Sequence, residues 1–481
     1  MKAQSLARNT MFSGLISISN VLLLAVVISA ARILGQKSFG VFSFALSLSS
    51  IFEMVVDFGL NVLVARDLAR DRSRSAVYLP HLLGWKMILS AVALMLLVAT
   101  VYIMGKDSQT RLVTYIMGTA IVLRSFKATS HAFFQSHERF DLLLLTTYIE
   151  RVLILVFGVA VLFITHSLIA FAASFALVRI PDVLISYYMV HRHIAPVRIG
   201  LNSKTIRLLQ IAAVPFGLNA FINTTYWQIG TVMLSWMRPA AEVGLYSAGF
   251  RIYEGLTLFP TILGTALLPR LSKLYADERE KFRSVALQSL RYLAIGAFPL
   301  IISFGILTPQ IVSLLFGRSY LPTAHPLRVL LGAAILMFAN WTFNTILISA
   351  NMEGYVMKVA AIGLAVGAAA NGLLISRYGS IGAGYAVVAG EVCMYSLLLL
   401  RARNILARFG ALSLAWKPIL ASAIAVGASL AYSPPHPVVK TILFILLYSA
   451  MLYLLRAFSS SDLSLIKSLF PSKVTDSSVE P

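Results

Sequence analysis

Long apolar stretches separated by short polar segments run along almost the whole chain. A helix that crosses a bilayer needs about 20 apolar residues at a rise of about 1.5 Å per residue. By this measure the pattern predicts an all-α polytopic membrane protein of about 14 spans, with 12 also open because the last two spans are the weakest. The predicted spans lie near residues 12–33, 40–62, 82–104, 112–135, 142–164, 167–189, 208–236, 245–268, 287–308, 327–350, 355–376, 380–400, 414–432 and 438–457.

The low fraction of charged residues strengthens this prediction. The chain is 58% hydrophobic, only 12% charged, and has a mean hydropathy of +0.83. Soluble domains are usually about 25% charged, and so little charge cannot cover a water-facing surface on 481 residues. The first apolar stretch, from about Phe12 to Ala31, is too long for the apolar region of a cleaved signal peptide, so we expect it to be retained as the first span.

The basic residues gather in alternate loops. A formal net charge of +21 would suggest a nucleic-acid partner in a soluble protein, whereas membrane proteins concentrate Lys and Arg in their cytoplasmic loops. Loops on the side of the N-terminus hold most of these residues, and segment 165–167 on the other side holds only His166. We therefore expect a multi-pass protein of the plasma (inner) membrane, with both termini cytoplasmic and no nucleic-acid partner.

Signatures of enzymes and of bound cofactors are missing. Cys393 is the only cysteine, which rules out a disulfide within the chain and any cysteine-based metal site. The sequence contains no G-x-x-x-x-G-K-[ST] phosphate loop and no H-E-x-x-H motif. We expect a transporter without catalytic residues, a metal site or a cofactor, with coupling to a proton or sodium gradient left open.

Two stretches resemble each other at a separation of 204 residues. Gly40 lies in Phe39-Gly40-Val41-Phe42-Ser43, and Gly244 lies in Val243-Gly244-Leu245-Tyr246-Ser247; a span and then a basic loop follow each. Both spans would run in the same direction across the membrane. A parallel repeat of this kind predicts two lobes related by an axis along the membrane normal, with the substrate path between them.

The repeat suggests where the chain divides. The predicted parts are an N-lobe of six spans, a basic cytoplasmic linker, a C-lobe of six spans, two additional spans, and a polar Ser-rich tail that we expect to be mobile and cytoplasmic. In order, these are residues 1–190, 191–207, 208–402, 403–458 and 459–481.

Ionisable residues inside predicted spans are costly, by about 2.5–3.5 kcal/mol on insertion scales, and are candidates for function. Glu53 and Asp57 lie four residues apart on one helical face, and Arg124 and Lys127 lie three apart. Either acids on another helix neutralise these two cations, or the cations face a wet cavity that accepts an anion. Both can hold in part.

Other polar residues in the spans have simpler explanations. Arg179 with Asp182 and Arg251 with Glu254 have the i,i+3 spacing of ion pairs, whereas Glu391 has no such neighbour. Glu150 and Arg151 open their span and are interpreted as structural. Asn219 and Asn223 lie four apart, where amides often form hydrogen bonds between helices; together with the charges they favour a polar interior.

Several short motifs together resemble the Wzx-type polysaccharide flippases of the multidrug/oligosaccharidyl-lipid/polysaccharide exporter superfamily. They recur in order over roughly residues 8–395, and each one alone is weak. The motifs are Ala31-Arg32-Ile33-Leu34-Gly35 before Phe39-Gly40-Val41-Phe42, Asp57-Phe58-Gly59-Leu60, Glu242-Val243-Gly244-Leu245-Tyr246-Ser247-Ala248, Leu268-Pro269-Arg270-Leu271-Ser272, Leu315-Phe316-Gly317 with Tyr320, and Asn371 with Gly379-Ser380-Ile381-Gly382-Ala383.

The resemblance implies a function. Proteins of that family move a polyprenyl-pyrophosphate-linked oligosaccharide from the inner to the outer leaflet by alternating access, through a cationic cavity between two lobes. It implies a lipid-linked glycan and the phospholipid bilayer as partners, with a polysaccharide polymerase and glycosyltransferases as further candidates. The expected head-group and substrate contacts are Arg32, Arg124, Lys127, Arg251, Asn219 and Asn223. The expected residues for coupling or charge balance are Glu53, Asp57 and Glu391.

Two other functions stay open from sequence alone. A cation-coupled multidrug exporter would need a net acidic cavity for cationic drugs, yet the span charges lean basic, and the first span carries no acid. Gln228 also stands where many relatives carry an acid, which argues against cation coupling through that helix. A membrane-embedded glycosyltransferase or ligase would be favoured by an essential acid in a large external loop, and no loop here is long.

Overall fold

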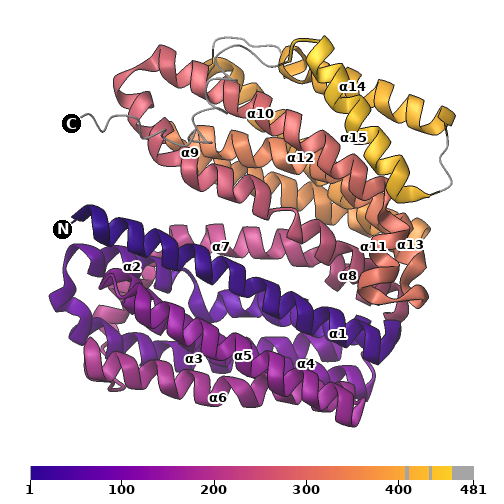
Figure 1. Ribbon diagram of the computed structural model, residues 1–481. Coiled ribbons are helices and arrows are strands. Elements are labelled where there is room, and N and C mark those ends of the chain that lie inside the picture. Colours follow the sequence, from indigo (N-terminus) through magenta and orange to yellow (C-terminus); the bar gives the residue numbers. More distant parts are fainter. Residues whose placement is uncertain (1, 407–410, 433–435, 458–481) are drawn as a thin grey trace, which may run out of the picture. The chain divides into compact units, whose positions relative to one another are not determined.

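The computed structural model of the protein describes residues 2–406, 411–432 and 436–457. Within these ranges the chain folds into helices joined by short connections, and no strand is present. Figure 1 shows the helices. Their bounds are α1 (Lys2–Asp57), α2 (Leu60–Arg70), η1 (Arg72–Arg74), α3 (Ser75–Ile103), α4 (Ser108–Ser136), α5 (Phe140–Thr165), α6 (Leu168–His193), α7 (Ser203–Met237), α8 (Ala240–Gly255), α9 (Leu258–Asp277), α10 (Arg279–Ile306), α11 (Thr308–Phe316), η2 (Arg318–Thr323), α12 (Ala324–Ser349), α13 (Glu353–Ile405), α14 (Ala411–Tyr432) and α15 (Pro437–Leu454).

The all-helical prediction is confirmed, and every predicted span falls on one or two of these helices. Ten helical segments in the described part of the chain are long and apolar enough to cross a membrane. Neither α4, which carries Arg124, Lys127 and many hydroxyl side chains, nor α14 is among the ten. The predicted tail, residues 459–481, lies outside the described residues, and the cytoplasmic placement of the termini stays a prediction.

Two of the helices are each long enough for two crossings. The 56 residues of α1 and the 53 residues of α13 would each extend about 80 Å as straight helices, against a hydrocarbon core of about 30 Å. Each bends at a glycine in a left-handed or otherwise positive-φ conformation, Gly35 (φ 74°) and Gly379 (φ 55°). Because L-residues rarely adopt such angles, these glycines mark where one predicted span ends and the next begins.

The chain forms two compact units, each built from separate stretches of sequence. The first unit holds residues 2–256, 310–330 and 353–394; the second holds residues 257–309, 331–352 and the described residues from 395 onward. In the first unit α1 packs against α4, α5, α7 and α8, while α6 packs against α4 and α5 (Figure 1). The predicted lobes and their linker at residues 191–207 stay predictions.

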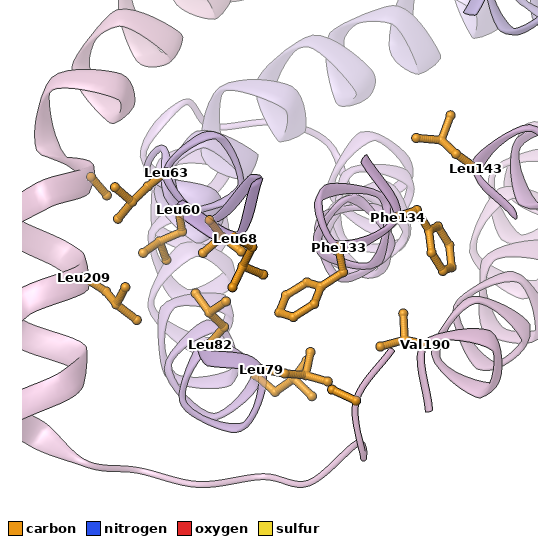
Figure 2. Packing of buried hydrophobic residues seen from close by; sticks show 14 of the residues in the cluster. Leu60, Leu63, Leu68, Leu79, Leu82, Phe133, Phe134, Leu143, Val190 and Leu209 are labelled. Atoms are coloured by element: carbon orange, nitrogen blue, oxygen red, sulfur yellow. The ribbon is translucent and has the colours of Figure 1, made fainter. Parts of the chain in front are cut away.

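A buried apolar cluster ties the short helix α2 to its neighbours in the first unit. Figure 2 shows leucines of α2 and α3 meeting phenylalanines of α4, with Leu209 of α7 beside them. This packing holds α2 in place immediately after a break in the helical path at Phe58 and Gly59, which have φ angles of 36° and 79°. The cluster includes Leu60, Leu63, Leu68, Leu79, Leu82, Phe133, Phe134 and Leu209.

In the second unit α10 packs against α9, α14 and α15. An apolar cluster of this unit includes Ala421, Ala425, Phe444 and Leu452, all almost fully buried. The Tyr448 hydroxyl donates to the Ile295 carbonyl at 2.8 Å. The two weakest predicted spans, α14 and α15, are therefore packed elements of this unit.

Candidate functional site

A cavity of about 570 Å³ lies inside the first unit. Its wall comes from α1, α4, α5, α6, α7 and α8, and its volume falls in the range of small-molecule binding sites. Apolar side chains such as Leu23, Val27 and Phe42 make part of the wall. The charged residues that line it are Glu53, Arg124, Lys127, Glu150, Arg151, Arg179, Arg251 and Glu254.

Arg124 on α4 faces both the cavity and a carboxylate. Its Nε donates to Glu53 Oε1 at 2.9 Å, and its Nη2 donates to the second oxygen of the same carboxylate, so the pair is bidentate. The Arg124 side chain is nevertheless 40% exposed, whereas that of Glu53 is 9% exposed. An acid from α1 therefore neutralises the cation, and the cation also faces open space. That this cavity accepts an anion stays a prediction.

Lys127, one turn along α4, is buried instead. Its Nζ lies 2.7 Å from Glu150 Oε2 and 2.8 Å from Asp182 Oδ1, and it donates to the Thr146 carbonyl at 3.0 Å. Its side chain is 3% exposed. A buried charge is tolerated only with such partners, so this lysine joins α4 to α5 and α6. Lys127 contributes to the cavity wall, but two carboxylates and a backbone carbonyl already contact its ammonium group.

Glu150 on α5 is the centre of this network. Besides Lys127, it faces Arg179 at 2.9 Å and Arg151 at 3.5 Å. Its side chain is only 7% exposed, and these contacts agree with the interpretation of Glu150 as structural. The predicted Arg179–Asp182 pair is replaced: α4 and α5 supply closer partners, so that Arg179 pairs with Glu150 and Asp182 pairs with Lys127.

The other predicted pair is confirmed. Arg251 Nη1 donates to Glu254 Oε2 at 2.7 Å on α8. Their side chains are 20% and 39% exposed, and both line the cavity. This pair therefore supplies a second partly accessible guanidinium.

Positive charge is in slight excess around the cavity. Among the described residues, five basic side chains line the wall, and four carboxylates (Glu53, Glu150, Asp182 and Glu254) contact them. An anion that competed with Glu53 or Glu254 would find guanidinium groups already aimed at it. Guanidinium binds phosphate and carboxylate in the same bidentate way.

Three other predicted substrate contacts lie off the cavity wall. Arg32 is exposed and donates to the Leu314 carbonyl. Asn219 and Asn223 are exposed on α7, and Asn223 Nδ2 donates to Asn219 Oδ1 at 3.0 Å. The cavity is lined instead by Thr224 and Gln228, which an α-helix turns about 100–180° from the two asparagines. A substrate role for Arg32, Asn219 and Asn223 stays a prediction.

The two remaining candidate acids also lie outside the wall. Glu391 on α13 is 2% exposed and accepts hydrogen bonds from the hydroxyls of Tyr226 at 2.8 Å and Tyr253 at 3.2 Å. Asp57 accepts from Lys86 Nζ at 2.8 Å. Lys86 is fully buried within the predicted span 82–104, and the rule for ionisable residues in spans, applied there, would have found it. Coupling roles for Glu53, Asp57 and Glu391 stay predictions.

Comparison with known proteins adds relatives of a consistent kind. A family model described as polysaccharide biosynthesis protein matches residues 6–275. A Staphylococcus aureus protein named for capsular polysaccharide biosynthesis is 21% identical over 63% of this chain and 77% of its own length. A Shigella flexneri protein named as an O-antigen transporter is 24% identical over 60% of this chain and 71% of its own length. A Haloferax volcanii protein named as a low-salt glycan biosynthesis flippase is 23% identical over 33% of this chain and 35% of its own length.

Solved structures show the same fold. The lipid II flippase MurJ in an inward closed conformation superposes with a TM-score of 0.72 at 14% identity, over 96% of this chain and all of that one. An inward-facing multidrug resistance MATE family transporter of the MOP superfamily gives 0.66 at 13% identity, over 81% of this chain and 95% of that one. Since the family model covers more than half of the 481 residues, the chain belongs to the polysaccharide biosynthesis protein family, a family of membrane transporters and flippases rather than of enzymes.

Proposed function

We propose that this protein flips a polyprenyl-pyrophosphate-linked oligosaccharide from the cytoplasmic to the outer leaflet by alternating access. The observation that carries the proposal is the cavity in the first unit, where the guanidinium of Arg124 is accessible and positive charge exceeds negative. The named functions of the relatives, an O-antigen transporter and a glycan flippase, support the same substrate class.

The chemistry of the substrate explains why such a cavity is needed. A pyrophosphate group cannot enter hydrocarbon without a very large desolvation cost. Guanidinium groups in a wet cavity replace its water with charge-assisted hydrogen bonds, while the polyprenyl tail stays in the bilayer. The cavity therefore needs cations that the head group can reach.

Exposure divides the cavity cations into two groups. The side chains of Arg124, Arg251 and Arg151 are 40%, 20% and 17% exposed. Those of Lys127 and Arg179 are 3% and 6% exposed. We assign head-group contact to the first group and positioning of α4, α5 and α6 to the second.

A multidrug exporter is the second candidate, because a MATE transporter shares the fold. Cationic drugs require a net acidic site, and the excess here is basic, which favours the anionic substrate. Coupling to a proton or sodium gradient, and partnership with a polymerase or glycosyltransferases, belong to the proposal as well.

A deletion strain tests this function. We expect loss of the surface glycan together with accumulation of its lipid-linked repeat unit on the cytoplasmic leaflet, rescued by the wild-type protein. Arg124→Ala at normal protein level should fail to rescue, whereas Arg70→Ala, which removes an exposed arginine of α2, should rescue fully. A normal surface glycan with heightened drug sensitivity in the deletion strain would favour the exporter instead.

A further inference from the structure

Two glycine contacts, with α8 and with α7, flank the stretch of α1 after Gly35 that lines the cavity. Leu23 and Val27 line the cavity from the part of α1 before the bend at Gly35, and in the part after it the lining stretch runs from Phe42 to Met54. Gly40 lies just before this stretch and Gly59 just after it. At both places the backbone of one segment touches the backbone of another, within the first unit. The backbones lie too close for a side chain to fit between them, so each contact joins this part of the chain directly to a neighbouring helix.

At the first contact the glycines of the sequence repeat meet. A Cβ on Gly40 would collide with the Ala240 carbonyl, and one on Gly244 would collide with the Gln36 carbonyl. The helix α1 runs through Gly40 without interruption. This contact therefore joins two continuous helical segments.

The second contact lies at a break in the helical path. A Cβ on Gly217 of α7 would lie 2.6 Å from the Phe58 carbonyl oxygen, and one on Gly59 would lie 2.7 Å from the Ala213 carbonyl oxygen. Phe58 and Gly59 both have positive φ. Positive φ at a phenylalanine is strained, and surrounding structure must hold such a conformation. The second contact is therefore the one with a built-in hinge.

Lys86 forms hydrogen bonds with residues on both sides of this hinge. Its Nζ donates to Asp57 Oδ1 at 2.8 Å, just before the break, and to Asn61 Oδ1 at 3.1 Å, just after it. It also donates to the Ser125 carbonyl at 3.1 Å on α4, and Thr129 donates to Asn61 at 3.0 Å. Lys86 itself is fully buried on α3. One charge thus fixes both sides of the break and anchors them to α3 and α4.

Apolar packing holds α2 in place beside this hinge. The leucines that follow Gly59 meet α3, α4 and Leu209 of α7 in the cluster of Figure 2. A change in the angle at Phe58 and Gly59 would move α2 relative to α7, separate these leucines from Leu209 and open the contact at Gly217. The buried lysine opposes that change, because losing its partners would leave an unpaired charge.

We propose that the Gly59–Gly217 contact is a gate of the cavity, and that Lys86 is the positioning residue that keeps it shut by fixing the α1–α2 break through Asp57 and Asn61. The inference rests on the proposed transport function for its purpose, but the gate itself can be measured without transport. This proposal gives the Asp57-Phe58-Gly59-Leu60 motif a role as the hinge and Lys86 a role as the residue that holds the hinge in place.

Thiol labelling of the full-length protein in vesicles tests the gate. In a Cys393→Ser background, Ala128→Cys places a single reporter on the cavity wall. We expect Lys86→Met to raise the rate of labelling by a membrane-impermeant thiol reagent about tenfold, equivalent to about 1.4 kcal/mol. The rise should come only from the face where Gly59 lies, since damage to the fold would raise labelling from both faces.

Two more variants keep the test decisive if Lys86→Met fails to fold. Lys86→Met with Asp57→Asn leaves no unpaired charge and should label at the same raised rate. Gly217→Ala should do so too, because its Cβ cannot fit beside the Phe58 carbonyl. Lys106→Met is the matched control: this lysine donates to the Ser235 carbonyl, and its loss should not raise labelling from the Gly59 face.

The outcomes separate the gate from the transport function. Unchanged labelling in all three variants would overturn the gate, whatever the glycan phenotype. Raised labelling from the Gly59 face alone would support the gate even if the deletion strain had a normal surface glycan, which would overturn the proposed substrate instead.

Discussion

Glu150→Ala is expected to destabilise the protein more than any other single change around the cavity. The substitution removes the carboxylate that faces Lys127, Arg179 and Arg151, and the first two of these are almost fully buried. Breaking a buried ion pair by deleting one partner typically costs about 3–5 kcal/mol, because the remaining charge cannot be solvated. We expect a much lower thermal unfolding midpoint and poor accumulation in the membrane.

Glu254→Ala is the matched control for this prediction. It also removes a glutamate that pairs with an arginine of the cavity, but the Glu254 side chain is 39% exposed. A pair with that much solvent access is worth about 1 kcal/mol or less. Thermal unfolding of both purified variants in detergent compares the two positions. Equal midpoints for Glu150→Ala and wild type would show that the network does not hold α4, α5 and α6 together.

Glu53→Gln is expected to strengthen the binding of a phosphate-containing anion. In the structure Glu53 occupies the guanidinium face of Arg124 in the bidentate way that a phosphate would. An incoming anion must displace this carboxylate. Hydrogen bonds to charged groups contribute about 1.5–3 kcal/mol, so removing the competitor should raise affinity about 10- to 100-fold.

Calorimetric titration with inorganic pyrophosphate measures this change. Glu138→Gln is the control, because it removes a carboxylate from an exposed pair with Arg72 outside the cavity wall. Its affinity for pyrophosphate should match that of the wild type. If Glu53→Gln binds pyrophosphate no more tightly than wild type does, Arg124 is not the anion contact.

The helices could be predicted because the length of an apolar run decides whether it spans a membrane. Every predicted span has its helix, including the two weakest, α14 and α15. The connections at Gly35 and Gly379 could not be predicted, because glycine between two apolar runs is equally typical of an open loop. The structure shows that a glycine with non-helical φ and ψ angles joins two helical parts directly at each of these positions.

The charges of the site could be found from sequence, but of their partners only the Arg251–Glu254 pair could be predicted. Arg124, Lys127, Glu150 and Arg179 stand out because ionisable residues are rare inside spans. Spacing along one helix then favoured an Arg179–Asp182 pair. The structure instead joins residues of α4, α5 and α6, because helix packing brings Glu150 and Lys127 closer.

The direction in which each side chain points also depends on how its helix is rotated about its own axis. The predicted ends of a span do not define that rotation. Lys127 lies three residues from Arg124, yet it points into the packing of α5 and α6 while Arg124 faces the cavity. On α7 a rotation of one residue separates the predicted Asn223 from Thr224, which lines the cavity. The sequence therefore predicted which helices form the site better than it predicted which residues on those helices face the cavity.

Flipping by the purified protein tests the central claim most directly. The protein would be reconstituted in vesicles with a fluorescent polyprenyl-pyrophosphate-linked oligosaccharide, and movement of the label between leaflets would be followed by its access to an impermeant quencher. We predict transfer by the wild type and by Arg70→Ala, and its loss in Arg124→Ala. Equal transfer by Arg124→Ala, or none by the wild type under any imposed ion gradient, would contradict a flippase that holds the anionic head group in this cavity.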